Sequence, residues 1–161
     1  MKRVVAWVVF LTLAQVTERL ALPQTANVML QSKSAEVYEA VIEFQIKSWD
    51  LSADSFCIEI NGRDADIEIL KHIGSARVKQ ASACKKQDSG PKKSFMSVVD
   101  KRTRKHSVIF DIEDIRWSGD AEAEIDGGWL CGDLCMAGGV YHAAHDQSGW
   151  HVTRFDAHIM S

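Results

Sequence analysis

Apolar and polar side chains alternate with a period close to two through the last third of the chain, and this constrains its fold most. Successive side chains of a β-strand point to opposite faces of the sheet, so alternation gives each strand one apolar and one polar face. The alternating segments are residues 107–117, 121–131, 140–146 and 150–160. They predict an antiparallel sheet of four or more strands with one buried face.

The apolar phase slips by one residue in two of these segments. In the first segment the slip falls at Glu113-Asp114, and in the last it falls at Thr153-Arg154. A β-bulge inserts one extra residue and restores the face of the side chains that follow it. The inner face of the last strand would then carry Trp150, Val152, Phe155 and Ile159. Two bulges in one sheet predict strong curvature.

Residues 34–48 carry apolar side chains at helical spacing. Val37, Val41 and Phe44 recur at i, i+4 and i+7, with glutamates elsewhere on the helical wheel. This spacing predicts an amphipathic helix that lies on the sheet. Residues 41–48 also alternate in part, so a strand there is the competing interpretation.

The middle of the chain predicts short elements. Residues 56–60 read as a strand and Asn61-Gly62 as a turn. Residues 64–72 read as a short helix with Ile67 and Leu70 facing inward. Residues 77–106 carry ten Lys or Arg against two acids, and we expect a loop or a broken strand pair there.

The N-terminus reads as an export signal. Met1-Lys2-Arg3 is basic, and residues 4–14 are apolar apart from one threonine. Eleven residues of helix cover about 16 Å, well short of a ~30 Å hydrocarbon core, so no stable membrane span is expected after processing. Cleavage after Ala14 or Ala26 fits the small residues there. We therefore assign residues 1–26 to signal peptide and tether, and residues 27–161 to a single α+β domain. A core helix or an uncleaved anchor is the alternative.

Export changes how the four cysteines are read, because an oxidising compartment favours disulfides. Three pairings are possible, and sequence position favours Cys57 with Cys84 and Cys131 with Cys135. Gly-Asp between the last two cysteines is turn chemistry, so they would flank a tight hairpin loop. The longer ring would then contribute more to stability than the five-residue ring.

The charge balance gives no global attraction to nucleic acid or to an anionic membrane, because the formal net charge is −3. Locally, residues 101–106 read Lys-Arg-Thr-Arg-Lys-His and resemble a heparin-type or phosphate-binding tract. The tract has no interleaved Phe, Tyr or Trp for stacking on bases. We favour a solvated hairpin edge, and a nucleic-acid partner is not expected.

A curved sheet around an N-terminal helix is similar to the cone of cystatin-like and nuclear-transport-factor-like folds. The tail is also similar to uncharacterised exported bacterial proteins that share a Gly-Leu-Cys-Gly hairpin and a Gly-x-Trp-x-Val strand. The residues that carry this resemblance are Gly128, Trp129, Leu130, Cys131, Gly132, Tyr141, Gly149, Trp150 and Val152. The resemblance implies a fold and no activity.

Two combinations of residues have metal-binding or catalytic chemistry, but neither is expected to form a site. His142 and His145 with Cys131 and Cys135 have zinc-binding chemistry, but a spacing of three puts the histidines on opposite faces of a strand. The acids that alternate with apolar residues are typical of a solvent face; they are Asp111, Glu113, Glu122 and Glu124. One of them would act as general acid or base only if it pointed into the mouth of a cone.

The sequence thus predicts an exported, non-enzymatic module that binds an unknown protein or small molecule. The alternatives are a cone-fold enzyme with a carboxylate or His in its cavity, and a polyanion binder acting through residues 101–106. No nucleophile elbow, phosphate loop or dinucleotide fingerprint occurs in the chain. We therefore assign no catalytic residue, metal or cofactor.

Overall fold

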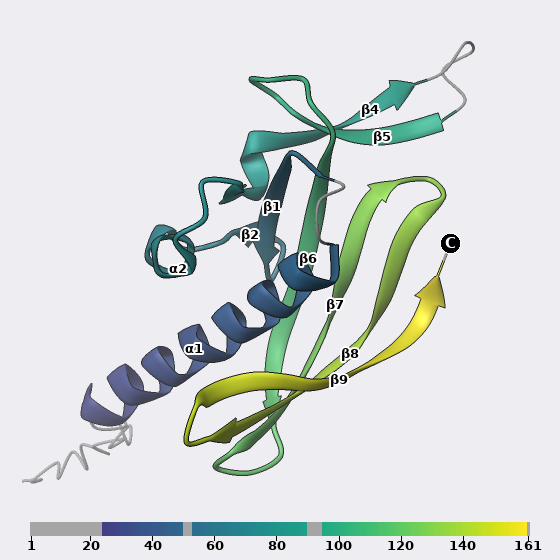
Figure 1. Cartoon of the computed structure of the whole chain (residues 1–161). Coiled ribbons are helices and arrows are strands. Elements are labelled where there is room, and N and C mark those ends of the chain that lie inside the picture. The colour runs from purple at the N-terminus through teal and green to yellow at the C-terminus, as the bar shows by residue number, and fades with distance from the viewer. Residues whose placement is uncertain (1–23, 50–52, 90–94, 161) are drawn as a thin grey trace, which may run out of the picture.

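The computed structural model describes residues 24–49, 53–89 and 95–160 (Figure 1). These residues form an α+β fold with two α-helices and a nine-stranded sheet. The elements are α1 (Gln24–Trp49), β1 (Ser55–Ile60), β2 (Arg63–Asp64), α2 (Ile67–Ile73), β3 (Val78–Gln80), β4 (Cys84–Ser89), β5 (Phe95–Asp100), β6 (Ser107–Trp117), β7 (Glu122–Gly132), β8 (Cys135–Asp146) and β9 (Gly149–Met160).

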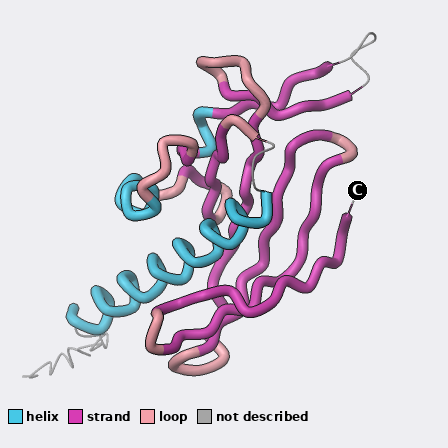
Figure 2. Tube along the Cα trace, in the orientation of Figure 1, coloured by secondary structure: helices cyan, strands magenta, loops and turns pink. Residues whose placement is uncertain are grey.

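The sheet is mixed, which corrects the expectation of a wholly antiparallel one. Strands β6 to β9 form the expected antiparallel meander, and their turns lie alternately at its two ends (Figure 2). Strand β1, however, runs parallel to both β6 and β3. A long connection through α2 and the β4–β5 hairpin separates β1 from β6, and parallel pairing requires such a crossover.

Both expected bulges are present. The pairing of β6 with β7 shifts between Ile112 and Ile115, where Glu113 and Asp114 together oppose one residue. The pairing of β8 with β9 shifts between His142 and Ala143, where Thr153 is the extra residue. It shifts again between Gly138 and Gly139, so Ile159 pairs with Gly138 and leaves the phase of Phe155; the expectation that Ile159 lies on the inner face was wrong. Each of the two expected bulges returns the apolar side chains directly after it to the face that packs against α1.

Helix α1 crosses one face of the sheet, called the inner face from here on, and contacts β6, β8 and β9 (Figure 1). It begins ten residues before the expected start at residue 34. Val37, Val41 and Ile42 are fully buried on it. They pack with the buried side chains of the sheet, which include Phe56, Ile58, Val108, Phe110, Ile112, Ile125 and Tyr141.

Helix α1 also contacts the end of β6 and the start of β9 through Lys33. The Lys33 ammonium lies 4.2 Å from the centre of the Trp117 ring, and Trp117 meets Trp150 edge to face. A cation over an indole face is attracted by the negative centre of the ring. Residues 1–23 of the expected signal peptide lie outside the described residues, whereas residues 24–26 belong to α1.

Helix α2 begins at Ile67, three residues later than expected. Asp66 caps it by accepting a hydrogen bond from the backbone of Glu68, and Gly74 ends it in the left-handed conformation. Leu70 is buried, but Ile67 is 50 % exposed, so the expectation that both face inward was wrong for Ile67. The helix has only two turns and buries a single residue.

The opposite, outer face carries a small second core at one end. Cys57, Cys84 and Val98 are buried there, with Ile109 and Leu130 packed against them. The hairpin β4–β5 covers this end, and Cys57 and Cys84 are disulfide-bonded across it with Cα atoms 6.1 Å apart. Cys131 and Cys135 are paired at the β7–β8 turn with Cα atoms 5.3 Å apart. Both pairs are those favoured by sequence position.

Candidate functional site

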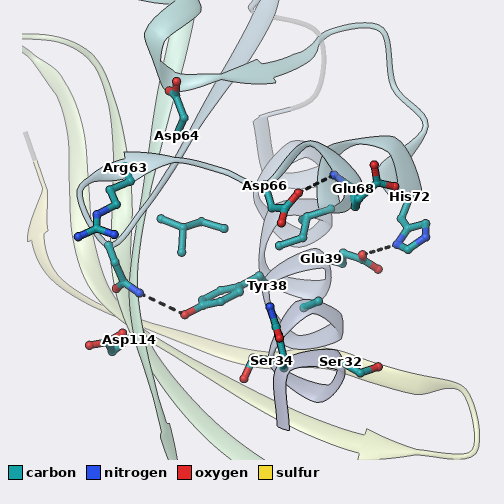
Figure 3. Close-up of a pocket in the computed structure, with 15 residues that line it drawn as sticks. Ser32, Ser34, Tyr38, Glu39, Arg63, Asp64, Asp66, Glu68, His72 and Asp114 are labelled. Carbon is teal, nitrogen blue, oxygen red and sulfur yellow. Dashed lines mark hydrogen bonds and ion pairs between the residues drawn. The ribbon is translucent and has the colours of Figure 1, made fainter. Parts of the chain in front are cut away.

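A cleft of about 820 Å³ opens between α1, α2 and the turn that joins β1 to β2 (Figure 3). Its apolar lining consists of half-buried side chains from three elements: Ala35 and Tyr38 of α1, Ile60 of β1 and Ile69 of α2. The volume lies within the range of ordinary small-molecule sites. The cleft lies outside the main core, so a ligand can enter it without displacing α1 from the sheet.

The local chain geometry explains why these three elements enclose a cleft. The turn at Asn61-Gly62 has positive φ at both residues and sends β2 back along β1. Asp66 then starts α2, which contacts α1. The sequence predicts this turn and this short helix, but it does not predict that they close against α1.

The rim of the cleft is strongly acidic. Five carboxylates line it, namely Glu39, Asp64, Asp66, Glu68 and Asp114, against one guanidinium, that of Arg63. Opposite charges at close range cancel part of this field, but Arg63 and Lys71, which pairs with Glu68, still leave an excess of three negative charges. The field of the cleft therefore favours cations.

Four of these carboxylates already have partners. Glu39 contacts the Nδ1 atom of His72 at 2.8 Å, and Glu68 pairs with Lys71 at 2.6 Å. Asp66 caps α2, and Asp64 accepts hydrogen bonds from the side chain and the backbone of Ser82, which hold the pKa of Asp64 below its usual range.

Asp114 differs from the other four, because it makes no hydrogen bond or ion pair with a described residue. It is the second residue of the β6 bulge, and it is exposed at the cleft. The bulge that corrects the phase of β6 thus also supplies the cleft with an uncommitted carboxylate.

Tyr38 places a neutral hydroxyl in the cleft. The side-chain amide of Asn61 donates to this hydroxyl at 3.5 Å. Burial raises the pKa of Tyr38, and the charge of Asp114 raises it further. The phenol therefore stays protonated at neutral pH and can donate a hydrogen bond. Figure 3 shows its hydroxyl turned toward the side of the cleft where Asp114 lies.

The carboxylates singled out in the sequence lie on the outer face, where a polar ladder crosses four strands. Arg116 pairs with Asp126 and contacts Glu124 at 3.6 Å. His142 lies between Glu124 at 3.6 Å and Asp156 at 3.1 Å. On β9, Arg154 pairs with Asp156 at 2.9 Å. The other carboxylates of this face are exposed; they are Asp111, Glu113 and Glu122. As expected, these are solvent-facing groups, and the Arg116 contact lowers the pKa of Asp126.

The expected alternative of a carboxylate inside a cone does not match what lies beneath α1. The polar contact there joins neutral groups, since the Gln45 amide donates to the Tyr141 hydroxyl at 2.9 Å. The Gln45 Oε1 atom is buried without a hydrogen-bond partner. Among the described residues, the buried carboxylate is Asp100, the last residue of β5, before the β5–β6 turn.

The zinc set considered from the sequence is not assembled. Cys131 and Cys135 are paired with each other, and His145 packs edge to face on Trp150, whereas His142 joins the polar ladder. Within the described ranges, no group of three or more His, Cys, Asp or Glu side chains is arranged to hold a metal ion. None of the helices described there combines the length and apolar character needed to cross a bilayer.

Comparison with protein-family models, with curated proteins and with solved structures found no match to this chain. The geometry of the cleft is therefore the basis on which function is inferred. The sequence missed its key residues, Tyr38, Glu39, His72 and Asp114. The one sequence feature that pointed to the cleft was the Asn61-Gly62 turn, because it folds the chain that follows it back against strand β1.

Proposed function

We propose that this chain is an exported, non-enzymatic binding module whose site is the cleft between α1, α2 and the β1–β2 turn. Its ligand is a cation with a small apolar group, such as an aryl or alkyl ammonium or the side chain of a basic peptide. The observation that carries the proposal is the cleft itself, an 820 Å³ space with an apolar floor and five carboxylates against one arginine.

The physical case has two parts. The acidic rim raises the local concentration of cations and repels anions. The apolar floor formed with Ile60 and Ile69 then removes the hydrocarbon part of the ligand from water, at about 25 cal/mol per Å² of buried apolar surface. A purely hydrophilic cation would gain only the first contribution.

Asp114 is the residue we expect to pair with the ligand cation. The other acids of the rim have partners within the protein, so a ligand would have to compete for them. Asp114 can pair with an ammonium group without giving up a contact, and the Tyr38 hydroxyl lies on its side of the cleft (Figure 3).

Calorimetric titration with benzylamine, which is cationic at pH 7, tests the proposal, and benzoate is the matched anion. We expect benzylamine to bind and benzoate not to. Asp114→Asn should weaken benzylamine binding about fivefold, the worth of one partly exposed ion pair. Glu113→Gln is the control, since Glu113 is the neighbouring bulge residue and does not line this cleft. Equal binding of benzoate, or an equal loss in Glu113→Gln, would contradict the proposal.

The export part of the proposal is supported by the two cysteine pairs at disulfide distance. Such pairs persist in oxidising compartments and are rare in the cytosol. The cone resemblance is likewise a proposal, supported by a helix that crosses a sheet whose pairing is interrupted by bulges in β6 and β9.

A catalytic role of the same cleft is the second candidate, and the Glu39–His72 contact favours it. A carboxylate on Nδ1 orients an imidazole, so that its Nε2 atom can accept a proton from water or substrate. The His72 side chain is 71 % exposed, however, and this does not exclude water as an active site usually does. Turnover of an amine ester that is lost in His72→Ala and reduced in Glu39→Gln would favour this candidate over simple binding.

A further inference from the structure

A second, oppositely charged surface lies at the end of the molecule formed by β3, β4 and the β5–β6 turn. We call it the basic end; it consists of Lys79, Lys85, Lys101, Arg102, Arg104 and Lys105. Three contacts join its parts: Lys79 pairs with Asp100, Lys85 lies opposite Val99 in the β4–β5 pairing, and Lys101 donates to the Ser82 carbonyl at 2.7 Å. Figure 1 shows the β5–β6 turn at the same end as β4 and β5.

The turn that presents these cations is organised by a buried carboxylate. Asp100 is 2 % exposed, and one of its oxygens accepts the backbone N–H groups of Arg102 at 2.8 Å and Thr103 at 2.7 Å. The Lys79 ammonium binds its other oxygen. The turn closes through a hydrogen bond from the Arg104 backbone to the Asp100 carbonyl at 2.9 Å. These hydrogen bonds therefore hold the backbone of Arg102 and Arg104 in one conformation, while their side chains are exposed.

Several of these six cations make no ion pair with a described residue of the protein. Lys79 pairs with Asp100, and Lys105 pairs with Asp54 at 3.2 Å. Lys101 lies near enough to Asp64 to lower its pKa slightly. Lys85, Arg102 and Arg104 make no ion pair with a described residue, so the basic end carries six cations against three carboxylates.

The acidic residues that follow in the sequence do not cancel the positive field of this surface. Asp111 is the first of them, and it lies six residues along extended chain from Lys105, or about 20 Å at 3.3 Å per residue. Screening at physiological ionic strength acts over about 8 Å. The field of the basic end is therefore largely independent of the acids of β6 and β7.

We propose that the basic end is a docking surface for an anionic polysaccharide that carries sulfate or phosphate groups along its chain. All six residues of the 101–106 tract are exposed, and none is Phe, Tyr, Trp or an aliphatic residue. Single-stranded nucleic acid would call for stacking aromatics, and membrane insertion would call for apolar side chains beside the charges. Flexible Lys and Arg side chains on a fixed turn match point charges spaced along a polymer.

The probe for this proposal is heparin, titrated into the full chain with disulfides intact. We expect binding at 50 mM salt that weakens steeply as salt rises, because bound counterions are released on binding. The variant Arg102→Ala/Arg104→Asn should weaken binding about tenfold and flatten the salt dependence. Asparagine is chosen at 104 because Arg104 has φ 62°, a conformation that asparagine tolerates. An unchanged melting temperature confirms that this variant folds.

The matched control is Lys47→Ala/Arg154→Ala, which removes the same net charge from α1 and β9. Both side chains are more than half exposed and far from the basic end in sequence. An equal loss in the control would overturn the proposal, because the attraction would then be a matter of net charge. No binding of heparin at 50 mM salt would also overturn it. Tighter, Arg102-dependent binding to duplex DNA or to anionic vesicles would overturn the polysaccharide as partner.

Discussion

The inner and outer faces of the β6–β9 meander satisfy their side chains in different ways. Tyr141 and His142 are neighbours in β8, yet Tyr141 is fully buried against Phe155 and Phe44, whereas His142 lies in a solvent-facing ladder of charges. The inner face gains stability from apolar burial that α1 completes. The outer face gains it from exposed ion pairs, each worth less than about 1 kcal/mol. Sites for ligands are thus expected outside the α1–sheet interface.

Truncating Tyr141 and His142 separately gives the largest expected difference between the two faces. Tyr141→Ala removes a buried ring that stacks on Phe155 at 4.5 Å, and we expect a loss of about 4 kcal/mol in the free energy of unfolding. His142→Ala should stay within about 1 kcal/mol. Urea unfolding of both variants measures the difference. Losses of similar size would show that the two faces are not energetically distinct.

The disulfides extend the comparison to the covered end of the outer face. In the chain-entropy model, the 28-residue ring closed by Cys57 and Cys84 contributes about 3.5 kcal/mol, and the five-residue ring of Cys131 and Cys135 about 2 kcal/mol. Replacing Cys57 and Cys84 by alanine should therefore lower stability more than replacing Cys131 and Cys135. Thermal unfolding of the two double variants measures this order. The reverse order would show that the second core does not depend on its disulfide.

Trp150 tests the inner face at the edge strand β9, because it packs on the core while remaining partly exposed. It meets Trp117 with ring centres 5.6 Å apart. We expect Trp150→Ala to cost about 3 kcal/mol, at the lower end of the range for large aromatic truncations. Arg154→Ala and His151→Ala, on the same strand, should each stay within about 1 kcal/mol. If Trp150→Ala were tolerated as well as these, the inner-face assignment of β9 would be wrong.

The meander was predictable because its information is local. Period-two alternation fixes which face of each strand is buried, and a one-residue slip reports a bulge, so the slips at residues 113–114 and 153–154 locate both. The favoured cysteine pairs also follow from position, since one spans a tight turn and leaves the other two as partners.

The remainder of the fold depends on contacts between distant segments. Strand β1 pairs in parallel with β6 about fifty residues later, and the sequence of neither strand indicates which strand it pairs with. Ile67 follows an i, i+3 pattern with Leu70, yet a two-turn helix at the surface buries only the second of them.

The cleft shows the same limit for function. Tyr38, Asn61 and Asp114 come from three separate elements, and each reads in the sequence as an ordinary helix, turn or strand residue. Only their meeting in space gives an acidic rim over an apolar floor. The basic tract at residues 101–106 was visible as a motif, but its separation from the acids of β6 required the structure.

The central claim is that the α1–sheet interface is closed and that the cleft beside it receives the ligand. Amide chemical-shift mapping of the isotope-labelled chain during titration with benzylamine tests it most directly. We predict that the perturbed amides cluster at Tyr38, Asn61 and Asp114, while those of Val108 and Tyr141 beneath α1 do not move. Perturbations centred on Val108 and Tyr141, with the cleft amides unchanged, would contradict the claim.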